Sequence, residues 1–137
     1  DLIKGMGGAL TREKIVASAS RQLIVVADET KLVEKLGADH PVPVEVLPFA
    51  LSTAMSRIRG MGGKPVLREG EGKVGPVVTD NGNIILDVDF GIIEAPKELN
   101  PRLKSIPGVI ETGLFVEMAN IVYIGRSATV QRLERKW

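Results

Sequence analysis

The sequence predicts an α/β protein with two parts, namely part of a doubly wound (Rossmann-like) sheet layer and a smaller α+β lobe. The first part is indicated by residues 22–27, a continuous apolar run rich in β-branched residues that follows a helical pattern. Strands buried on both faces of a parallel sheet have this composition. The smaller lobe is indicated by the element order β-α-β-β-α-β between residues 42 and 115.

The first 27 residues predict a loop, a helix and a strand. Residues 1–3 are expected to end a strand that leads into a glycine-rich loop. A helix is expected over residues 11–20, because Ile15 and Ala19 fall on one face and the charged residues fall elsewhere. The buried strand of residues 22–27 follows, so this part alternates as a doubly wound layer does.

A short helix is expected over residues 30–36, where Leu32 and Leu36 are apolar and Gly37 ends the pattern. A sheet with so few strands cannot bury both of its faces, so its remaining partners are expected upstream of this sequence. Two prolines in residues 38–43 interrupt helix and strand patterns alike, and they mark the boundary between the two parts.

The smaller lobe follows in order. Strands are expected over residues 42–47, 66–69, 77–79, 84–89 and 109–115, with a helix that starts at Pro48 and a second helix around residues 99–106. The hairpin signal is Asp80-Asn81-Gly82-Asn83, because these residue types tolerate positive φ. Pro101 interrupts the second helix, which is therefore expected to be kinked or short, with Asn100 as its N-cap. The order is that of a ferredoxin-like lobe.

The last segments are expected to return to strand–helix alternation, with a strand over residues 121–124 and a final helix over residues 128–135. They are expected to rejoin the first part. The predicted organisation is therefore an α/β domain made of residues 1–40 and 120–137, and a small ferredoxin-like domain of residues 41–119.

Composition and charge exclude several kinds of function. Eighteen basic and 17 acidic side chains give a net charge of +1, which supplies no electrostatic reason to bind nucleic acid or an anionic membrane. The absence of cysteine excludes a disulfide framework, a thiolate metal site and a cysteine nucleophile. The apolar runs fall far short of the ~20 residues that span a bilayer. We expect a soluble cytoplasmic protein.

The candidate site is the loop Lys4-Gly5-Met6-Gly7-Gly8, which runs into a helix with Glu13 in its first turn. Glycines let the backbone approach a ligand and present N–H groups near a helix start, which favours anions. Glu13 is a candidate general base if Lys4 polarises an adjacent carbonyl. Plainer interpretations remain open: Glu13 complements the helix dipole, Lys4 is solvated, and the glycines make a tight turn.

Lys31 and His40 are two further residues of types that occur in binding sites. Lys31 follows the carboxyl end of the predicted strand, where open α/β sheets bind ligands, although position alone slightly favours an exposed lysine at a helix start. His40 is a lone histidine in a loop with no second ligand nearby, so no metal site is expected. A dinucleotide site is disfavoured, because the loop lacks the third glycine of that fingerprint.

Six ordered motifs together resemble the A-type ribose-5-phosphate isomerases, and they cover essentially the whole chain. They are KGMGGALTREK at residues 4–14, ADETKLV at 27–33, PVPVEVLP at 41–48, VTDNGN at 78–83, IPGV at 106–109 and GLF at 113–115.

This resemblance implies an enzyme that interconverts ribose 5-phosphate and ribulose 5-phosphate through an enediolate, without metal or organic cofactor. It implies that Glu13 is the catalytic base, which moves a proton between C2 and C1, and that Lys4 stabilises the developing oxyanion. The implied substrate-binding residues are Lys4, Gly5, Met6, Gly7 and Lys31. A homodimer or homotetramer is also implied, with apolar surface of the smaller lobe as its interface.

Two departures from the family pattern stand out. Met6 occupies a position where glycine is usual, which the backbone accepts only if φ there is negative. The family's phosphate-binding serine/threonine loop and its aspartate-rich motif, both expected upstream, are not in these 137 residues. The sequence is therefore expected to be the C-terminal part of such an enzyme, inactive or nearly so by itself.

Two other functions remain open. One is a non-catalytic phosphosugar sensor on the same fold, which would bind ligand without needing Glu13. The other is an independent ligand-binding or dimerisation module formed by residues 42–115, which would fold when residues 41–119 are expressed alone.

Overall fold

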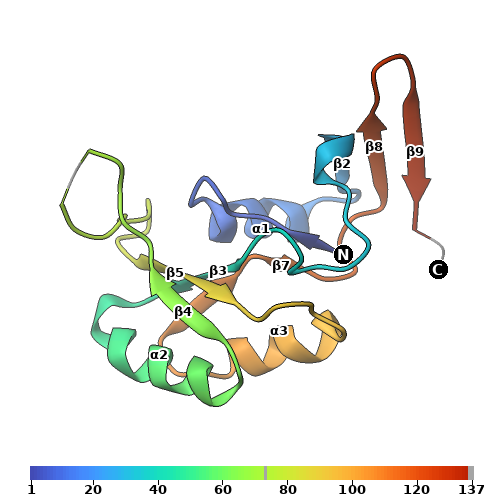
Figure 1. Ribbon diagram of the computed structural model, residues 1–137. Coiled ribbons are helices and arrows are strands. Elements are labelled where there is room, and N and C mark those ends of the chain that lie inside the picture. Colours follow the sequence, from blue (N-terminus) through green and yellow to red (C-terminus); the bar gives the residue numbers. More distant parts are fainter. Residues whose placement is uncertain (73, 136–137) are drawn as a thin grey trace.

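The computed structural model describes residues 1–72 and 74–135, so the last two residues of the expected α/β domain lie outside the described part (Figure 1). Its elements are β1 (Leu2–Ile3), α1 (Leu10–Ala19), β2 (Ile24–Asp28), the 3-10 turn η1 (Glu29–Lys31), β3 (Val42–Val46), the 3-10 turn η2 (Pro48–Ala50), α2 (Leu51–Gly60), β4 (Lys64–Leu67), β5 (Ile84–Asp89), α3 (Pro96–Lys104), β6 (Val109–Thr112), β7 (Leu114–Phe115), β8 (Ile121–Gly125) and β9 (Val130–Glu134). Among the described helices, none has the length and apolar character needed to cross a bilayer.

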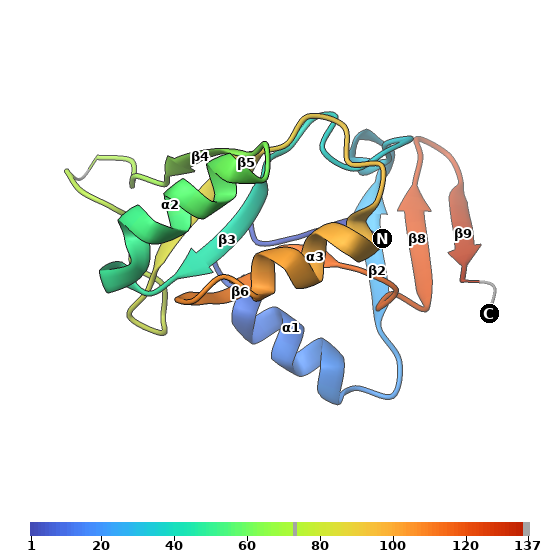
Figure 2. The same cartoon turned by 90° about the horizontal axis from the view of Figure 1, so that it is seen from below.

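A four-stranded antiparallel sheet forms the centre of the structure, with the strand order β4-β5-β3-β6. Together with α2 and α3 it confirms the predicted β-α-β-β-α-β order. Both helices pack on one face of this sheet, and α1 lies on the other face (Figures 1 and 2). The sheet is therefore the middle layer between two helical layers.

Alternation along the strands assigns each side chain to one of these two layers. Val44 in β3 and Leu86 in β5 are fully buried toward α2 and α3, where they join Ile58 and Leu103 in the main core. Glu45, next to Val44, is equally buried but points the other way and bonds to α1. The main core therefore lies beneath the sheet, and polar contacts hold α1 above it.

The predicted hairpin turn is confirmed at Asp80-Asn81-Gly82-Asn83. Gly82 has φ +78° and donates its N–H to the Thr79 carbonyl over 2.9 Å, while Thr79 donates its own N–H to the Asn83 carbonyl over 2.8 Å. The strand before the turn is shorter than expected, because it pairs only through a bridge between Val78 and Ile84.

A second sheet has the order β2-β8-β9, with β2 parallel to β8 and β8 antiparallel to β9. The final helix expected over residues 128–135 is wrong, because this segment forms the hairpin strand β9. Val130 and Leu133 offered the apolar helical face, whereas in the structure every residue of β9 pairs in register with a residue of β8. A tight connection closes the hairpin, where Arg126 donates its N–H to the Thr129 carbonyl over 2.8 Å.

The strand β2 differs from its prediction in burial. The side chains of Ile24 and Val26 are 49% and 78% exposed, and Ile15 and Val16 of α1 are exposed as well. Within the described chain, β2 has a sheet partner on one side only, and these apolar side chains remain at the surface.

The short helix expected over residues 30–36 is also wrong, because only the 3-10 turn of residues 29–31 forms. Asp28 caps this turn by accepting the Thr30 N–H over 2.9 Å. Further along, the Leu36 carbonyl accepts the Ile93 N–H over 2.9 Å, so the backbone after the turn bonds to another segment instead of continuing a helix.

The helix α3 begins at Pro96, not at Asn100, and it includes Pro101. Proline suits a first helical position, which explains the earlier start. Asn100 does not cap the helix: its Oδ1 accepts the Thr112 hydroxyl over 2.6 Å and ties α3 to β6.

The segment predicted as one strand over residues 109–115 divides at Gly113 into β6 and β7, and β7 pairs antiparallel with β1. Gly113 donates its N–H to the Pro43 carbonyl over 2.7 Å and accepts the Lys4 N–H over 2.8 Å. A Cβ at this position would lie 2.2 Å from the Lys4 carbonyl oxygen. Gly113 therefore lets the chain segment that enters the glycine loop lie directly against the central sheet.

We predict that Gly113→Ala lowers the free energy of unfolding by about 1–3 kcal/mol, because the new methyl group forces backbone apart. Urea unfolding measures the effect. Gly60→Ala is the matched control, because a Cβ there meets no atom within 4 Å. The control should leave stability unchanged or raise it by up to ~1 kcal/mol. Equal stability of the two variants would contradict the close approach at Gly113.

Candidate active site

The glycine loop between β1 and α1 is a tight turn with two positive-φ glycines. Gly5 and Gly8 have φ of +100° and +86°, and the Gly8 N–H donates to the Gly5 carbonyl over 3.0 Å. A Cβ on Gly5 would lie 2.7 Å from the Cβ of Leu10, so glycine is required there. Met6 is not among the positive-φ residues, which explains why methionine fits the loop.

Several backbone donors of this loop have no acceptor among the described residues, and two of them are adjacent. The N–H groups of Met6 and Gly7 make no hydrogen bond to any residue that the structure describes. The Met6 side chain is 47% exposed, so the loop lies at the surface. Adjacent free N–H groups of this kind form a concave site that attracts anions.

Lys4 and Glu13 meet beside the loop. The Lys4 Nζ lies 3.3 Å from Glu13 Oε1, and the two side chains are 31% and 39% exposed. Lys4 Nζ also lies 5.9 Å from the centre of the Phe115 ring, which is fully buried. The structure thus brings together the predicted base and the predicted cation, with the free loop donors on the chain between them.

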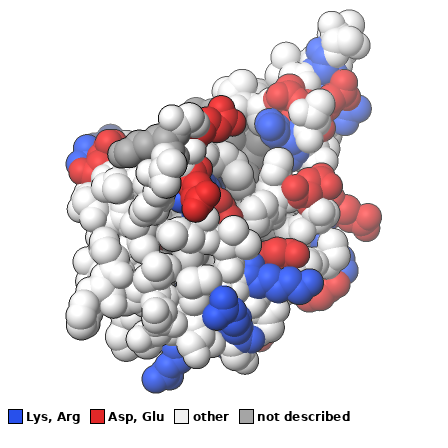
Figure 3. Space-filling model, turned by 60° about the vertical axis from the view of Figure 1, so that its left-hand side comes forward, with Lys and Arg blue, Asp and Glu red and all other residues white. Residues whose placement is uncertain are grey.

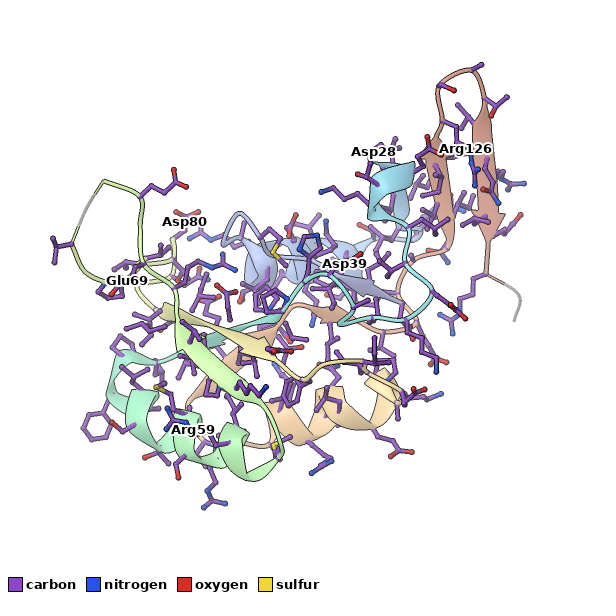
Figure 4. All side chains as sticks on the ribbon, in the orientation of Figure 1. Asp28, Asp39, Arg59, Glu69, Asp80 and Arg126 are labelled. Atoms are coloured by element: carbon purple, nitrogen blue, oxygen red, sulfur yellow. The ribbon has the colours of Figure 1, made fainter. Side chains whose placement is uncertain are left out.

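Lys31 lies elsewhere, on η1 after β2. It lines a cleft of about 880 Å³ together with Lys4 and His40, and Glu13 is not among the residues that line this cleft. Asp28 and Arg126 lie close by, at neighbouring carboxyl ends of β2 and β8 (Figure 4). Within the described residues, no group of three histidine or carboxylate side chains is placed to hold a metal ion.

Sequence reasoning missed the structural role of Lys14, one residue after the candidate base. Its ammonium donates to Glu111 Oε1 over 2.9 Å and to the carbonyls of Thr112 and Leu114 over 2.6 and 2.9 Å. Burial lowers the pKa of Lys14, and the bond to Glu111 opposes this shift. The signal was present in its spacing from Glu13, since adjacent helical residues point in different directions. Lys14 fixes α1 to β6 and β7 and leaves Glu13 facing the loop.

Glu45 was also missed, although a lone carboxylate in the apolar strand β3 was visible in the sequence. Its buried carboxylate accepts hydrogen bonds from side chains of α1 and the hairpin. The donors are Thr11 Oγ1, Thr79 Oγ1 at 2.8 Å, Asn81 Nδ2 at 3.0 Å and Asn83 Nδ2 at 2.9 Å. Burial alone would raise the pKa of Glu45, but these four bonds together hold it below its ordinary value.

The fold and this loop define an α/β protein with a surface site suited to an anionic ligand, where a carboxylate and an ammonium group lie together. Comparison with known proteins is more specific. The sequence pattern of the family described as ribose 5-phosphate isomerase A (phosphoriboisomerase A) matches residues 1–129. The chain belongs to this family.

Relatives named ribose-5-phosphate isomerase A are about half identical to the chain over the residues that align. The protein of Thermosynechococcus vestitus is 54% identical over 125 residues, which are 91% of this chain and 53% of the relative. That of Archaeoglobus fulgidus is 53% identical over 134 residues, which are 96% of this chain and 59% of the relative. The chain therefore spans little more than half the length of these relatives.

Solved structures agree with this assignment. Ribose 5-phosphate isomerase A of Methanocaldococcus jannaschii superposes with a TM-score of 0.93 at 45% identity, over 98% of this chain and 59% of that one. A D-ribose-5-phosphate isomerase in complex with phospho-erythronic acid gives a TM-score of 0.94 at 46% identity, over 98% and 58% of the two chains.

We predict that acid destabilises the protein partly through Glu45. Because its folded-state pKa is depressed, its contribution to stability is complete above its ordinary pKa of 4.5 and is lost as the pH falls through the folded value. Glu45→Gln should lower the free energy of unfolding at pH 7 by about 1–3 kcal/mol, because buried donors lose their charged acceptor. Urea unfolding between pH 3 and 7 measures both effects.

Part of the acid sensitivity should survive in Glu45→Gln, since bonds from the Thr112 N–H, Lys14 and Lys104 hold the pKa of Glu111 low despite its burial. Glu29→Gln is the control, because this half-exposed carboxylate makes a single distant ion pair with Arg126 at 3.9 Å. A stability profile of Glu45→Gln that parallels the parent at every pH would contradict the assignment.

Proposed function

We propose that this protein is an aldose–ketose isomerase that interconverts ribose 5-phosphate and ribulose 5-phosphate. One observation carries the proposal: an ammonium and a carboxylate lie 3.3 Å apart beside a loop with two free N–H donors. Isomerisation through an enediolate requires a base at carbon and positive charge near oxygen. The relatives named as isomerases support the same reaction.

In this proposal Glu13 is the base. Its carboxylate removes the proton from C2 of the open-chain aldose, and the electron pair moves to give an enediolate with its charge on O1. The resulting carboxylic acid returns the proton to C1, while the proton of the C2 hydroxyl moves to O1. The net change is the ketose, so the proposed chemistry consists of proton transfers alone.

Lys4 has the role of electrophile. Its ammonium ion is to stabilise the charge that develops on O1, and one such donor is typically worth about 3 kcal/mol in the transition state. The backbone N–H groups of Met6 and Gly7 are to bind substrate oxygens, with Gly5 permitting the turn. In this proposal Lys31 contacts the substrate from the cleft that it lines together with Lys4.

We further propose the domain boundaries stated from the sequence, with residues 41–119 as the smaller domain. The four-stranded sheet with α2 and α3 falls entirely within these residues. The candidate site lies where this unit meets the rest of the chain, since β1 pairs with β7. We also propose that activity requires groups that the longer relatives have and this chain does not.

A homodimer or homotetramer is the proposed assembly, with its interface on the smaller domain. Phe49 in η2 is fully exposed, and Leu47 beside it is 45% exposed. Figure 3 brings this side forward and shows a broad area free of charged side chains. An apolar area of this kind is typical of a protein interface. Sedimentation velocity of Phe49→Ser should then show a smaller species than the parent.

We predict that Glu13→Gln abolishes isomerisation and leaves ligand binding intact. Loss of a general base typically costs about 10²–10⁴-fold in rate. In a chain that also carries the upstream part of the longer relatives, proton NMR of ribose 5-phosphate in D2O should show ribulose 5-phosphate with deuterium for the parent only. Titration with phospho-erythronic acid should give similar dissociation constants for both proteins.

Glu98→Gln, which changes an exposed carboxylate in the first turn of α3, should match the parent in both measurements. Turnover that survives in Glu13→Gln would exclude this residue as the base. Binding without turnover in the parent that carries the upstream part of the longer relatives would favour the phosphosugar sensor instead.

A further inference from the structure

Arg68 follows β4 and is held firmly by an aspartate of the neighbouring strand. Its Nε and Nη2 donate to the two carboxylate oxygens of Asp87 over 2.8 and 2.6 Å. The two side chains are only 14% and 24% exposed. This paired arrangement fixes the plane of the guanidinium group, because both parallel bonds must be kept. Asp87 is therefore the anchor of this arginine.

The remaining guanidinium nitrogen reaches the glycine loop. Arg68 Nη1 donates to the carbonyl of Gly5 over 3.0 Å and to the carbonyl of Met6 over 2.9 Å. These two carbonyls belong to successive peptide units. One cation therefore sets the direction of two consecutive peptide planes in the loop.

The bonds from Arg68 to the two carbonyls also set the direction of the loop N–H groups, because each peptide unit is rigid. In a planar trans peptide the C=O and the following N–H point in opposite directions. The unit that carries the Gly5 carbonyl also carries the Met6 N–H, and the unit that carries the Met6 carbonyl also carries the Gly7 N–H. Because both carbonyls face Arg68, both N–H groups face away from it. Neither of these two donors makes a hydrogen bond to a residue that the structure describes.

We propose that Arg68, anchored by Asp87, is a positioning residue that holds the Met6 and Gly7 N–H groups ready for the ligand. This inference rests on the proposed function for the identity of the ligand. Arg68 itself acts from behind the loop and touches no substrate. A flexible loop with a positive-φ residue at each end would otherwise lose the alignment of these donors, and misplacement by about 1 Å can lower a rate by ~10²-fold.

Lysine cannot replace Arg68 in this role. Its single ammonium is a point charge without the planar fork that bonds Asp87 on two nitrogens and the loop on a third. Asp87→Asn should act in the same direction as a change of Arg68, because it releases the fork without touching the loop.

The test compares Arg68→Lys, Arg68→Ala and Asp87→Asn with the parent. Arg132→Ala is the matched control, because Arg132 makes a half-exposed pair with Glu134 at 2.9 Å on β9. The first readout is the 15N order parameter of the Met6, Gly7 and Gly8 amides, with global folding checked by the spectrum of the remaining residues. We expect values near 0.85 in the parent and the control, and below about 0.6 in the three variants.

The second readout is affinity for phospho-erythronic acid, which should weaken at least tenfold in the three variants and stay unchanged in Arg132→Ala. Where the parent turns over ribose 5-phosphate, kcat should fall by up to ~10²-fold in the same variants. A rigid loop and parental affinity in Arg68→Lys would overturn the proposal. If the parent neither binds nor isomerises the sugar phosphate while the order of its loop still depends on Arg68, the result contradicts the proposed function and not the role of Arg68.

Discussion

The buried carboxylate of Glu45 is the interaction on which the rest of the structure depends. It lies on the central strand β3 and is completely removed from solvent, a position that a carboxylate tolerates only when its oxygens are well bonded. Its donors come from α1 and from the hairpin near residue 80. One charge therefore fixes the helix that carries Glu13, the hairpin and the sheet relative to one another. Below the sheet, ordinary apolar packing by α2 and α3 completes the core.

Sequence patterns predicted the elements with regular periodicity and failed where other segments decide the conformation. The apolar strand segments and the hairpin turn predicted the β-α-β-β-α-β order of elements along the smaller lobe correctly. Val130 and Leu133 are spaced as on one face of a helix, so the local pattern of residues 128–135 favoured a helix. Pairing with β8 overrides this local preference. Similarly, Asn100 resembles an N-cap locally, yet Thr112 of β6 binds its side chain. Contacts between distant segments leave no periodic signal.

In the candidate site, too, local features were predictable and contacts between distant segments were not. Lys4, Glu13 and the glycine loop are contiguous in sequence, so their proximity was predictable from the turn and the first helical turn after it. The supporting residues are not contiguous: Arg68 reaches the loop over more than 60 residues of sequence. Spacing cannot reveal such a contact, because it depends on the register between β4 and β5 that brings Arg68 beside Asp87. The residue types predicted the chemistry of the site, whereas the residues that hold the loop in place became visible only in the fold.

The ion pairs that hold the scaffold differ in burial and hydrogen bonding from the ion pair of the candidate site. Arg68–Asp87 and Lys14–Glu111 are largely buried, each cation donates two or more hydrogen bonds, and both pairs join the loop or α1 to the sheet. Lys4–Glu13 is about one third exposed and has a single contact at 3.3 Å. Exposed pairs typically contribute about 1 kcal/mol or less, so a ligand can separate this pair at little cost. The scaffold pairs resist such exchange, because breaking one leaves a buried charge unpaired. Lys4 and Glu13 are therefore held near each other by a rigid frame, while each remains free to exchange its partner for a substrate atom.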